Sequence, residues 1–252
     1  MLTPEERTRY NRQMLIYGFG EEGQLKLKNS TIFIAGAGGL GSPVAYYLAA
    51  AGIGTIRIVD CDIVELSNLN RQILHFTDNI GQRKVDSAKD KLSRLNPDIT
   101  IEAICENITE DNIAGLIGEA DGIVDAMDNL PVRYLLNHTA IRKGIPFFHG
   151  AVNGYEGRVM TVIPGKSACL NCLYHGARPP QEKIPVLGAT PGVVGSLQAT
   201  EVIKYLTGTG DLLLDRLLCY DGYSMRFSEL TVHRNPACEH CVNQRQVIDN
   251  ER

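Results

Sequence analysis

Four glycines fall within the six residues Gly36-Ala-Gly-Gly-Leu-Gly41, and this segment constrains the fold more than any other part of the chain. The residues before it, Thr31–Ala35, are mostly β-branched or aromatic, which is typical of a strand. The residues after it, Leu40–Ala51, predict a helix. A tight glycine turn between a strand and a helix is typical of the first unit of a parallel α/β sheet.

The same alternation continues to about residue 150. Apolar residues recur at helical spacing within Ile80–Leu95, and Pro131 stands where the first turn of another helix would begin. Because strands that alternate with helices form parallel sheets, residues 1–150 predict an N-terminal arm followed by a Rossmann-like, doubly wound half. The further strands of this half are predicted at Thr55–Val59, Ile99–Ile104, Gly122–Ala126 and Ile145–Gly150.

The pattern becomes rich in β-structure after residue 150. Gly157–Ile163 predicts a strand with no helix directly after it, and the four prolines within 173–191 predict a long loop. Gly192–Leu206 predicts a helix, and 212–234 predicts antiparallel strands. We therefore expect residues 151–252 to form a second, β-rich half on the same continuous sheet.

The composition limits what such a chain binds. Of its 252 residues, 44% are hydrophobic and 21% are charged, which predicts a folded core instead of disorder. The net charge of −4 argues against a general nucleic-acid binder, which would normally be basic. The N-terminus is polar, and the uncharged stretch Asn29–Ile56 contains six glycines, so neither resembles a signal peptide or a membrane span. We expect a soluble, cytoplasmic protein.

The glycine segment also predicts a nucleotide site. Glycines let the backbone approach a phosphate, and the start of the following helix favours negative charge. Asp60 ends the next predicted strand, at a place suited to hydrogen-bonding ribose hydroxyls. On these residues alone the leading interpretation is an NAD-dependent oxidoreductase, and the alternative is a tight turn that binds no ligand.

Polar residues beyond the strand ends favour a ligand with more phosphate charge. Ser67–Gln72 contains Arg71, and Lys84 lies near the start of a helix, where a cation is unfavourable unless an anion such as a triphosphate is near. Asp128 and Asn129 follow the strand that ends near residue 126. They suit a helix cap, and Asp128 also suits a carboxylate ligand of Mg²⁺ beside phosphates.

Several motifs occur together in a fixed order, and they resemble the MoeB/ThiF/HesA family, bacterial relatives of ubiquitin-activating enzymes. The resemblance runs from about residue 5 to about residue 242. The motifs are Arg9-Tyr-Asn-Arg-Gln13, Gly36-Ala-Gly-Gly-Leu-Gly-Ser42, Asp60-Cys-Asp62, Ser67-Asn-Leu-Asn-Arg-Gln72, Gly81-Gln-Arg-Lys84, Asp128-Asn129, two C-x-x-C pairs and Gly195-Ser-Leu-Gln-Ala199.

The resemblance implies ATP-dependent adenylation of the C-terminal glycine of a small ubiquitin-like sulfur-carrier protein that ends in Gly-Gly. It also implies a homodimer in which Arg12 reaches the partner subunit's active site, and it allows a sulfur donor protein as a further partner. The catalytic residues would be Arg12, Arg71, Lys84 and Asp128, of which Asp128 would also hold Mg²⁺. The ATP-binding residues would be Gly36, Gly38, Gly39, Gly41, Asp60, Ser67, Asn68, Leu69, Asn70, Arg71, Lys84, Asp128 and Asn129.

Two C-x-x-C pairs, Cys169–Cys172 and Cys238–Cys241, predict a structural zinc site. Four thiolates fill a tetrahedral zinc shell and leave no open position for catalysis. His240 would then be a bystander. Redox pairs or buried free thiols are the alternatives.

The chain departs from the family pattern in one respect. Many members carry a cysteine in the loop after the first C-x-x-C pair, whereas residues 173–218 contain none, and Cys61, Cys105 and Cys219 lie elsewhere. The resemblance therefore supports activation of the carrier but not a covalent step on this chain. It leaves the carrier pathway and the sulfur donor open. Adenylation of a peptide C-terminus or a modified tRNA base is an alternative, as is a non-enzymatic scaffold that binds the carrier.

Overall fold

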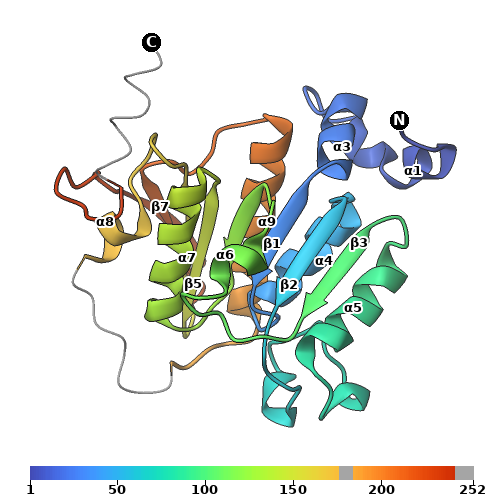
Figure 1. The fold of residues 1–252 in the computed structure, drawn as a ribbon, viewed down its shortest axis with the longest axis horizontal. Coiled ribbons are helices and arrows are strands. Elements are labelled where there is room, and N and C mark those ends of the chain that lie inside the picture. The colour runs from blue at the N-terminus through green and yellow to red at the C-terminus, as the bar shows by residue number, and fades with distance from the viewer. Residues whose placement is uncertain (176–183, 242–252) are drawn as a thin grey trace.

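The computed structural model describes residues 1–175 and 184–241, which form one eight-stranded sheet with helices on both faces (Figure 1). The strand order is β3-β2-β1-β4-β5-β6-β7-β8. The first five strands are parallel, and β6 to β8 continue the sheet in antiparallel fashion. The strands are β1 (Thr31–Ala35), β2 (Thr55–Val59), β3 (Thr100–Ile104), β4 (Gly122–Asp125), β5 (Phe147–Asn153), β6 (Glu156–Val162), β7 (Arg216–Asp221) and β8 (Arg226–Thr231).

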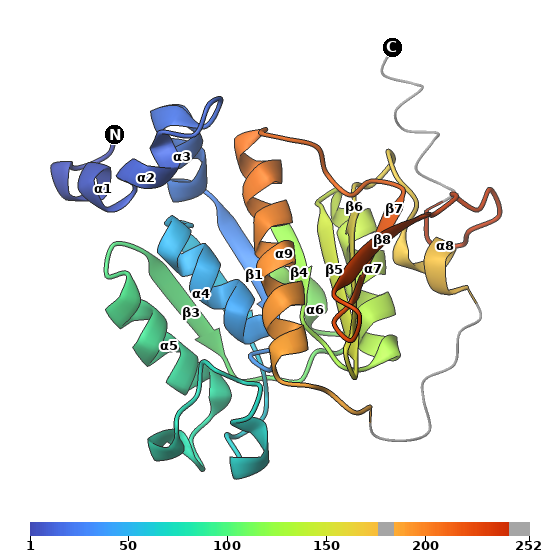
Figure 2. The ribbon, with the colours of Figure 1, turned by 180° about the vertical axis from the view of Figure 1, so that it is seen from behind.

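Two hydrophobic layers hold the helices against this sheet. Side chains of β1 alternate between them, since Ile32 and Ile34 pack under α4 and α9 while Phe33 packs under α6 and α7. Figures 1 and 2 show these two helix layers on opposite faces. The helices are α1 (Pro4–Arg9), α2 (Asn11–Met14), α3 (Gly20–Lys28), α4 (Gly41–Ala51), α5 (Lys84–Leu95), α6 (Ile113–Ile117), α7 (Leu130–Lys143), α8 (Leu170–Tyr174) and α9 (Ala189–Thr207).

The predicted fold class is confirmed: a Rossmann-like parallel sheet is continued by antiparallel strands. Residue 150, where the character of the sequence changes, lies inside β5, so the sheet runs unbroken from one half to the other. Within the described residues, no helix has both the length and the apolar character needed to cross a membrane.

Several element boundaries differ from the prediction by a few residues. The helix expected over Ile80–Leu95 begins only at Lys84, because residues 80–83 form a turn in which the Gly81 N–H donates to the Val64 carbonyl. Helix α9 begins at Ala189 and contains Pro191 in its first turn, where a missing N–H costs no helical bond. The predicted loop 173–191 is correspondingly shorter at both ends, and its residues 176–183 lie outside the described chain.

Candidate functional site

The glycine loop lies between β1 and α4, at the point where the strand order reverses. Gly36 has φ +103°, and a Cβ on it would lie 2.8 Å from the Ala126 carbonyl oxygen. A Cβ on Gly41 would lie 1.9 Å from the Gly36 carbonyl oxygen. Only glycine fits at these two positions, and the crevice beside them is where parallel α/β sheets bind ligands.

Asp60 follows β2 and holds the glycine loop in place. One carboxylate oxygen accepts the Ala37 N–H at 2.8 Å, and the other accepts the Asp62 N–H at 2.8 Å. Burial raises the pKa of Asp60, while the nearby Lys84 ammonium lowers it. The structure thus places Asp60 beside the loop, as the sequence predicts, and its contact with a ribose stays a prediction.

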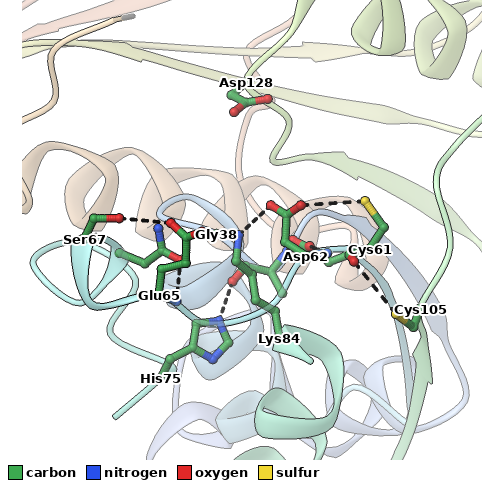
Figure 3. Close-up of polar contacts among 12 residues, drawn as sticks. Gly38, Cys61, Asp62, Glu65, Ser67, His75, Lys84, Cys105 and Asp128 are labelled. Atoms are coloured by element: carbon green, nitrogen blue, oxygen red, sulfur yellow. Dashed lines mark hydrogen bonds and ion pairs between the residues drawn. The ribbon is translucent and has the colours of Figure 1, made fainter. Parts of the chain in front are cut away.

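Lys84 is buried at the first residue of α5, and its ammonium lies 2.8 Å from an Asp62 carboxylate oxygen. The sequence predicts a triphosphate beside a cation at this helix end. In the structure, Asp62 is an acidic partner of Lys84 within the chain itself. Figure 3 shows Lys84, Asp62 and Gly38 on the same side of the site.

The polar segment Ser67–Gln72 lies against the glycine loop. Asn68 is buried in a 3-10 turn, where its side-chain oxygen accepts the Glu65 N–H at 3.1 Å. The Arg71 guanidinium donates to the Ser67 carbonyl at 2.9 Å. Its Cγ lies 3.6 Å from the position of a Cβ on Gly39. Arg71 is therefore close enough to the loop to contact a bound phosphate.

Gln72 is a buried residue of this segment that the sequence analysis did not assign to the site. Its side-chain nitrogen lies 3.6 Å from the position of a Cβ on Gly38. Among the described residues, its side-chain oxygen has no hydrogen-bond partner although it is buried. A hydroxyl or amine of a bound ligand would satisfy this acceptor, which is compatible with a nucleotide beside the loop.

Asp128 and Asn129 have different surroundings in the structure, although the Asn129 amide nitrogen lies 3.5 Å from an Asp128 carboxylate oxygen. Asn129 caps α7, since its side-chain oxygen accepts the Val132 N–H at 3.0 Å. Asp128 is exposed on the loop between β4 and α7, and Figure 3 shows it across the site from Gly38 and Lys84. The cap explanation therefore fits Asn129, and a role of Asp128 as a ligand of Mg²⁺ stays a prediction.

A buried polar cluster that was not predicted from the sequence fixes the loop that carries Asp128. Asp125 accepts the Met127 N–H at 3.1 Å and lies 2.7 Å from a ring nitrogen of His149. Arg133 donates to the Met127 carbonyl from the other side. The sequence contains one signal for this cluster. Asp125 stands within the otherwise apolar segment Gly122–Ala126, and a buried carboxylate needs hydrogen-bonding or charged partners.

Arg12 lies far from the glycine loop of its own chain. The neighbouring Gln13 donates to the Ala51 carbonyl at 2.8 Å, at the last residue of α4. Helix α4 begins beside the glycine loop and has 11 residues, so it is about 16 Å long. Arg12 is exposed on α2, and the fold does not bring it to the other candidate residues of this chain.

The four predicted metal ligands come together. The Sγ atoms of Cys169, Cys172, Cys238 and Cys241 all lie within 4.8 Å of one another. Neighbouring pairs are 3.6 to 3.8 Å apart. Tetrahedral zinc with Zn–S bonds near 2.3 Å would place its sulfurs about 3.8 Å apart, so the cluster could hold zinc.

The surroundings act differently on the thiols of the cluster. Burial raises the pKa of Cys169 and Cys241, whereas at Cys238 burial is outweighed by hydrogen bonds from Asn171 and the nearby backbone, which lower the pKa to about 7. Cys169 and Cys241 would therefore need a bound cation to be held as thiolates. The Asn171 amide donates to the Cys238 sulfur, and the Asn235 N–H donates to the Cys172 sulfur, both at 3.4 Å.

The remaining cysteines and His240 lie outside this cluster. The His240 ring lies 3.2 Å from the Asn137 amide and against His138. Cys61 is exposed after β2, with its sulfur 2.9 Å from the Asn107 side-chain oxygen. Cys219 lies in β7 and is partly buried against the core.

Comparison with known proteins decides the family. The model of the ThiF family matches residues 10–240. The chain belongs to the ThiF family. The resemblance stated from the sequence motifs is therefore confirmed. The matched region contains the glycine loop and three of the four clustered cysteines, and Cys241 lies one residue beyond it.

Relatives with similar sequences cover almost the whole chain. The sulfur carrier protein adenylyltransferase of Thermus thermophilus is 41% identical over 99% of this chain and 97% of its own length. The SAMP-activating enzyme E1 of Haloferax volcanii is also 41% identical, over 92% of this chain and 88% of its own. The heterocyst protein HesA of Trichormus variabilis is 39% identical, over 96% of this chain and 91% of its own length.

Solved structures agree with the fold. The structure of E. coli MccB with ATP superposes with a TM-score of 0.85 at 27% identity, and the match covers 93% of this ThiF-family chain and 75% of MccB. The chain is an enzyme of the ATP-using adenylyltransferase type, as the sequence motifs implied. This assignment replaces the oxidoreductase that the glycine loop alone favoured.

Proposed function

We propose that this ThiF-family enzyme adenylates the C-terminal glycine of a small ubiquitin-like sulfur-carrier protein. The observation that carries the proposal is the 41% identity, over nearly the full length of both chains, to a protein named for that activity. The carrier's carboxylate attacks the α-phosphate of ATP, the bond to the β-phosphate oxygen breaks, and pyrophosphate leaves. The product is an acyl-adenylate, ready for sulfur transfer.

Two anions meet in this step, so charge neutralisation and positioning matter more than a general base. The glycine loop would hold phosphate on its N–H groups, and Asp60 would accept ribose hydroxyls. Arg71 and Lys84 would neutralise phosphate charge. Mg²⁺ bound at Asp128 would supply further positive charge beside the phosphate oxygens.

The four-cysteine cluster has a structural role in this proposal. A Cys₄ shell leaves no coordination position open, so no reaction step passes through the metal. Its ligands come from the start of α8 and from residues 238–241, near the end of the described chain. The metal, which we propose to be zinc, would tie these two segments together.

Two groups of exposed apolar side chains are suited to contacts with protein partners. Tyr223, Met225, Phe227 and Leu230 are exposed on β8 and the turn before it, and we propose that the carrier docks on this β-rich half. Leu15, Ile16 and Tyr17, which follow three to five residues after Arg12, are exposed. We propose that these three residues lie at the interface of a homodimer, which would bring Arg12 to the partner subunit's site.

Pyrophosphate–ATP exchange tests the proposed reaction. We expect exchange when a Gly-Gly-ended carrier and Mg²⁺ are present, and none with the same carrier lacking its last glycine. Exchange that needs no carrier, or that fails with every Gly-Gly-ended carrier of the same genome, would contradict the proposal.

Adenylation of another acyl substrate is the second candidate. It is favoured by the structural likeness to MccB, which has been solved with MccA and therefore shows the fold beside a different partner. A peptide C-terminus would be such a substrate, while the weak net charge argues against a modified tRNA base. Exchange stimulated by a short peptide and not by a folded carrier would favour this candidate.

A further inference from the structure

His75 is a buried residue that connects α5 to the glycine loop. One ring nitrogen, Nε2, lies 2.9 Å from the Ala37 carbonyl oxygen, and the other, Nδ1, lies 3.0 Å from the Ser87 hydroxyl. The ring is only 3% exposed. Figure 3 shows His75 on one side of the loop, directed at the backbone beside Gly38. Neither the sequence motifs nor the proposed reaction assigns it a role.

The contacts of His75 fix its tautomer. A carbonyl oxygen only accepts, so Nε2 carries the proton and donates to Ala37. Burial, with lesser effects from Lys84 and Lys91, lowers the pKa of His75 to about 4, so the ring is neutral and Nδ1 accepts from Ser87. The Ser87 oxygen in turn accepts from the Lys91 ammonium at 2.8 Å. The three hydrogen bonds are therefore donated in one direction. Lys91 donates to Ser87, Ser87 donates to His75, and His75 donates to the Ala37 carbonyl of the glycine loop.

This contact sets the orientation of one peptide group. In a planar trans peptide the C=O and the N–H point in opposite directions. Because the Ala37 C=O is turned toward His75, the Gly38 N–H of the same peptide is directed away from it. The preceding peptide is held as well, since the Ala37 N–H donates to Asp60. Two successive peptide planes are thus oriented by side chains from different elements.

Gly38 needs such a constraint. Glycine has a wide choice of backbone angles, so an unheld Ala37–Gly38 peptide could turn over at little cost. In the parts of the chain that the structure describes, neither the Gly38 nor the Gly39 N–H has an acceptor within hydrogen-bond range. N–H groups at the start of a helix that point the same way form an anion-binding concavity.

We propose that His75 is a positioning residue, which orients the Ala37–Gly38 peptide so that the Gly38 N–H faces a phosphate of the bound nucleotide. The inference rests on the proposed ATP site. It predicts a selective effect, because the peptide would matter for ligands that carry phosphate and not for the nucleoside. A purely structural role would weaken both kinds of ligand together.

Equilibrium dialysis with labelled ATP and labelled adenosine tests this selectivity. His75→Gln keeps a side-chain N–H that can reach the Ala37 carbonyl, and His75→Leu removes the donor at similar size. Leu92→Ala serves as the matched control, because Leu92 is a fully buried residue in the last turn of α5, whereas the start of that helix faces the site. Thermal unfolding of each variant reports the common loss of stability.

We expect His75→Leu to weaken ATP binding by about tenfold or more, which is the loss typical of one hydrogen bond to a charged group. Adenosine binding should stay within about twofold, and His75→Gln should restore most of the ATP affinity. Leu92→Ala should lower the melting temperature without this selectivity. Equal losses for ATP and adenosine in His75→Leu, or no loss of either, would overturn the inference.

A second measurement keeps this inference apart from the proposed function. NMR of ¹⁵N-labelled wild-type protein should show the Nε2–H tautomer of His75 without any nucleotide. The Nδ1–H tautomer would overturn the inference even if ATP binds normally. Failure of the wild-type protein to bind ATP at all would instead remove the proposed function on which the inference rests.

Discussion

The Lys84 ammonium and the Asp62 carboxylate form an ion pair at 2.8 Å that joins the start of α5 to the segment after β2. The two side chains are unequally exposed, 6% for Lys84 and 64% for Asp62. Asp62 is thus free to move into solvent, while the lysine stays beside the glycine loop and Asp60. A phosphate bound beside the glycine loop could replace Asp62 as the partner of the lysine.

Single replacement of Lys84, Arg71 or Asp128 by Ala should slow carrier-dependent pyrophosphate exchange. Each side chain supplies charge or holds Mg²⁺ in the proposed transition state, so each loss should cost at least about 2 kcal/mol, or roughly 30-fold in rate. Asp62→Asn is the matched control, since it removes the partner of Lys84 but leaves the ammonium in place. Exchange at the wild-type rate in all three alanine variants would contradict the site assignment.

Metal analysis of the purified protein should find one zinc per chain. Because the proposed site is structural, Cys172→Ser should lower the melting temperature strongly and change ATP affinity little. Cys219→Ser, which removes a partly buried thiol outside the cluster, is the control. A protein that contains no zinc and keeps normal thermal stability would refute the metal assignment.

No thioester or acyl-disulfide between enzyme and carrier should accumulate with ATP. Residues 173–218 contain no thiol, and burial together with the carboxylates of Asp62 and Asp60 raises the pKa of Cys61. Since the thiolate is the nucleophile, Cys61 is poorly suited to this step. Intact-mass measurement on the reaction mixture checks the prediction, and a conjugate mapped to Cys61, Cys105 or Cys219 would reverse it.

Local patterns revealed most of the fold. The turn at Gly36 and Gly41 could be predicted from the sequence, because it depends only on the strand before it and the helix after it along the chain. The N-terminal helices were missed although a signal was present: Thr3 and Glu6 form a capping box around Pro4, which is itself typical of a first helical turn.

The partners of buried polar groups could not be predicted in the same way. Asp62 and Lys84 are 22 residues apart, and His75 and Ala37 are 38 apart, so each contact depends on how a loop returns to the sheet. The sequence supplied the residue types but not these pairings. The sequence therefore predicted a cation near the glycine loop, but it did not predict the contact between His75 and Ala37.

Acid should destabilise the protein in part through His75. Burial lowers the folded-state pKa of His75 from its usual 6.5 to about 4, so below pH 6.5 the unfolded state takes up the proton first. Stability is therefore lost as the pH falls from 6.5 toward 4, by about 2 kcal/mol between pH 7 and pH 5. His149, whose pKa burial also lowers, acts in the same direction.

Urea unfolding of wild-type protein and His75→Gln at the two pH values isolates this contribution. Glutamine does not titrate, whereas His149 and the carboxylates are common to both proteins. The variant should therefore lose less stability than the wild type between pH 7 and pH 5. Equal losses in the two proteins would show that His75 is already protonated or exposed in the folded state.

Arg12 should act on the partner subunit's active site. It is exposed on α2, beside the end of α4 that lies about 16 Å from the glycine loop, and Leu15, Ile16 and Tyr17 expose apolar surface three to five residues after it. An arginine that only pairs with surface charges is the alternative, since most exposed arginines are simply solvated. The two roles predict different activities for a dimer that contains one Arg12→Ala subunit and one Asp128→Ala subunit.

Symmetry gives the expected recovery. In a two-fold dimer each site takes its Arg12 from the other chain, so Arg12→Ala and Asp128→Ala should each be inactive alone. When equal amounts exchange subunits, half of the dimers are mixed, and each mixed dimer has one site with its own Asp128 and an intact Arg12 from its partner. Exchange activity should return to roughly a quarter of the wild-type level. If Arg12 acts within its own chain, every site keeps one defect, so an absence of recovery after confirmed subunit exchange would exclude the role in trans.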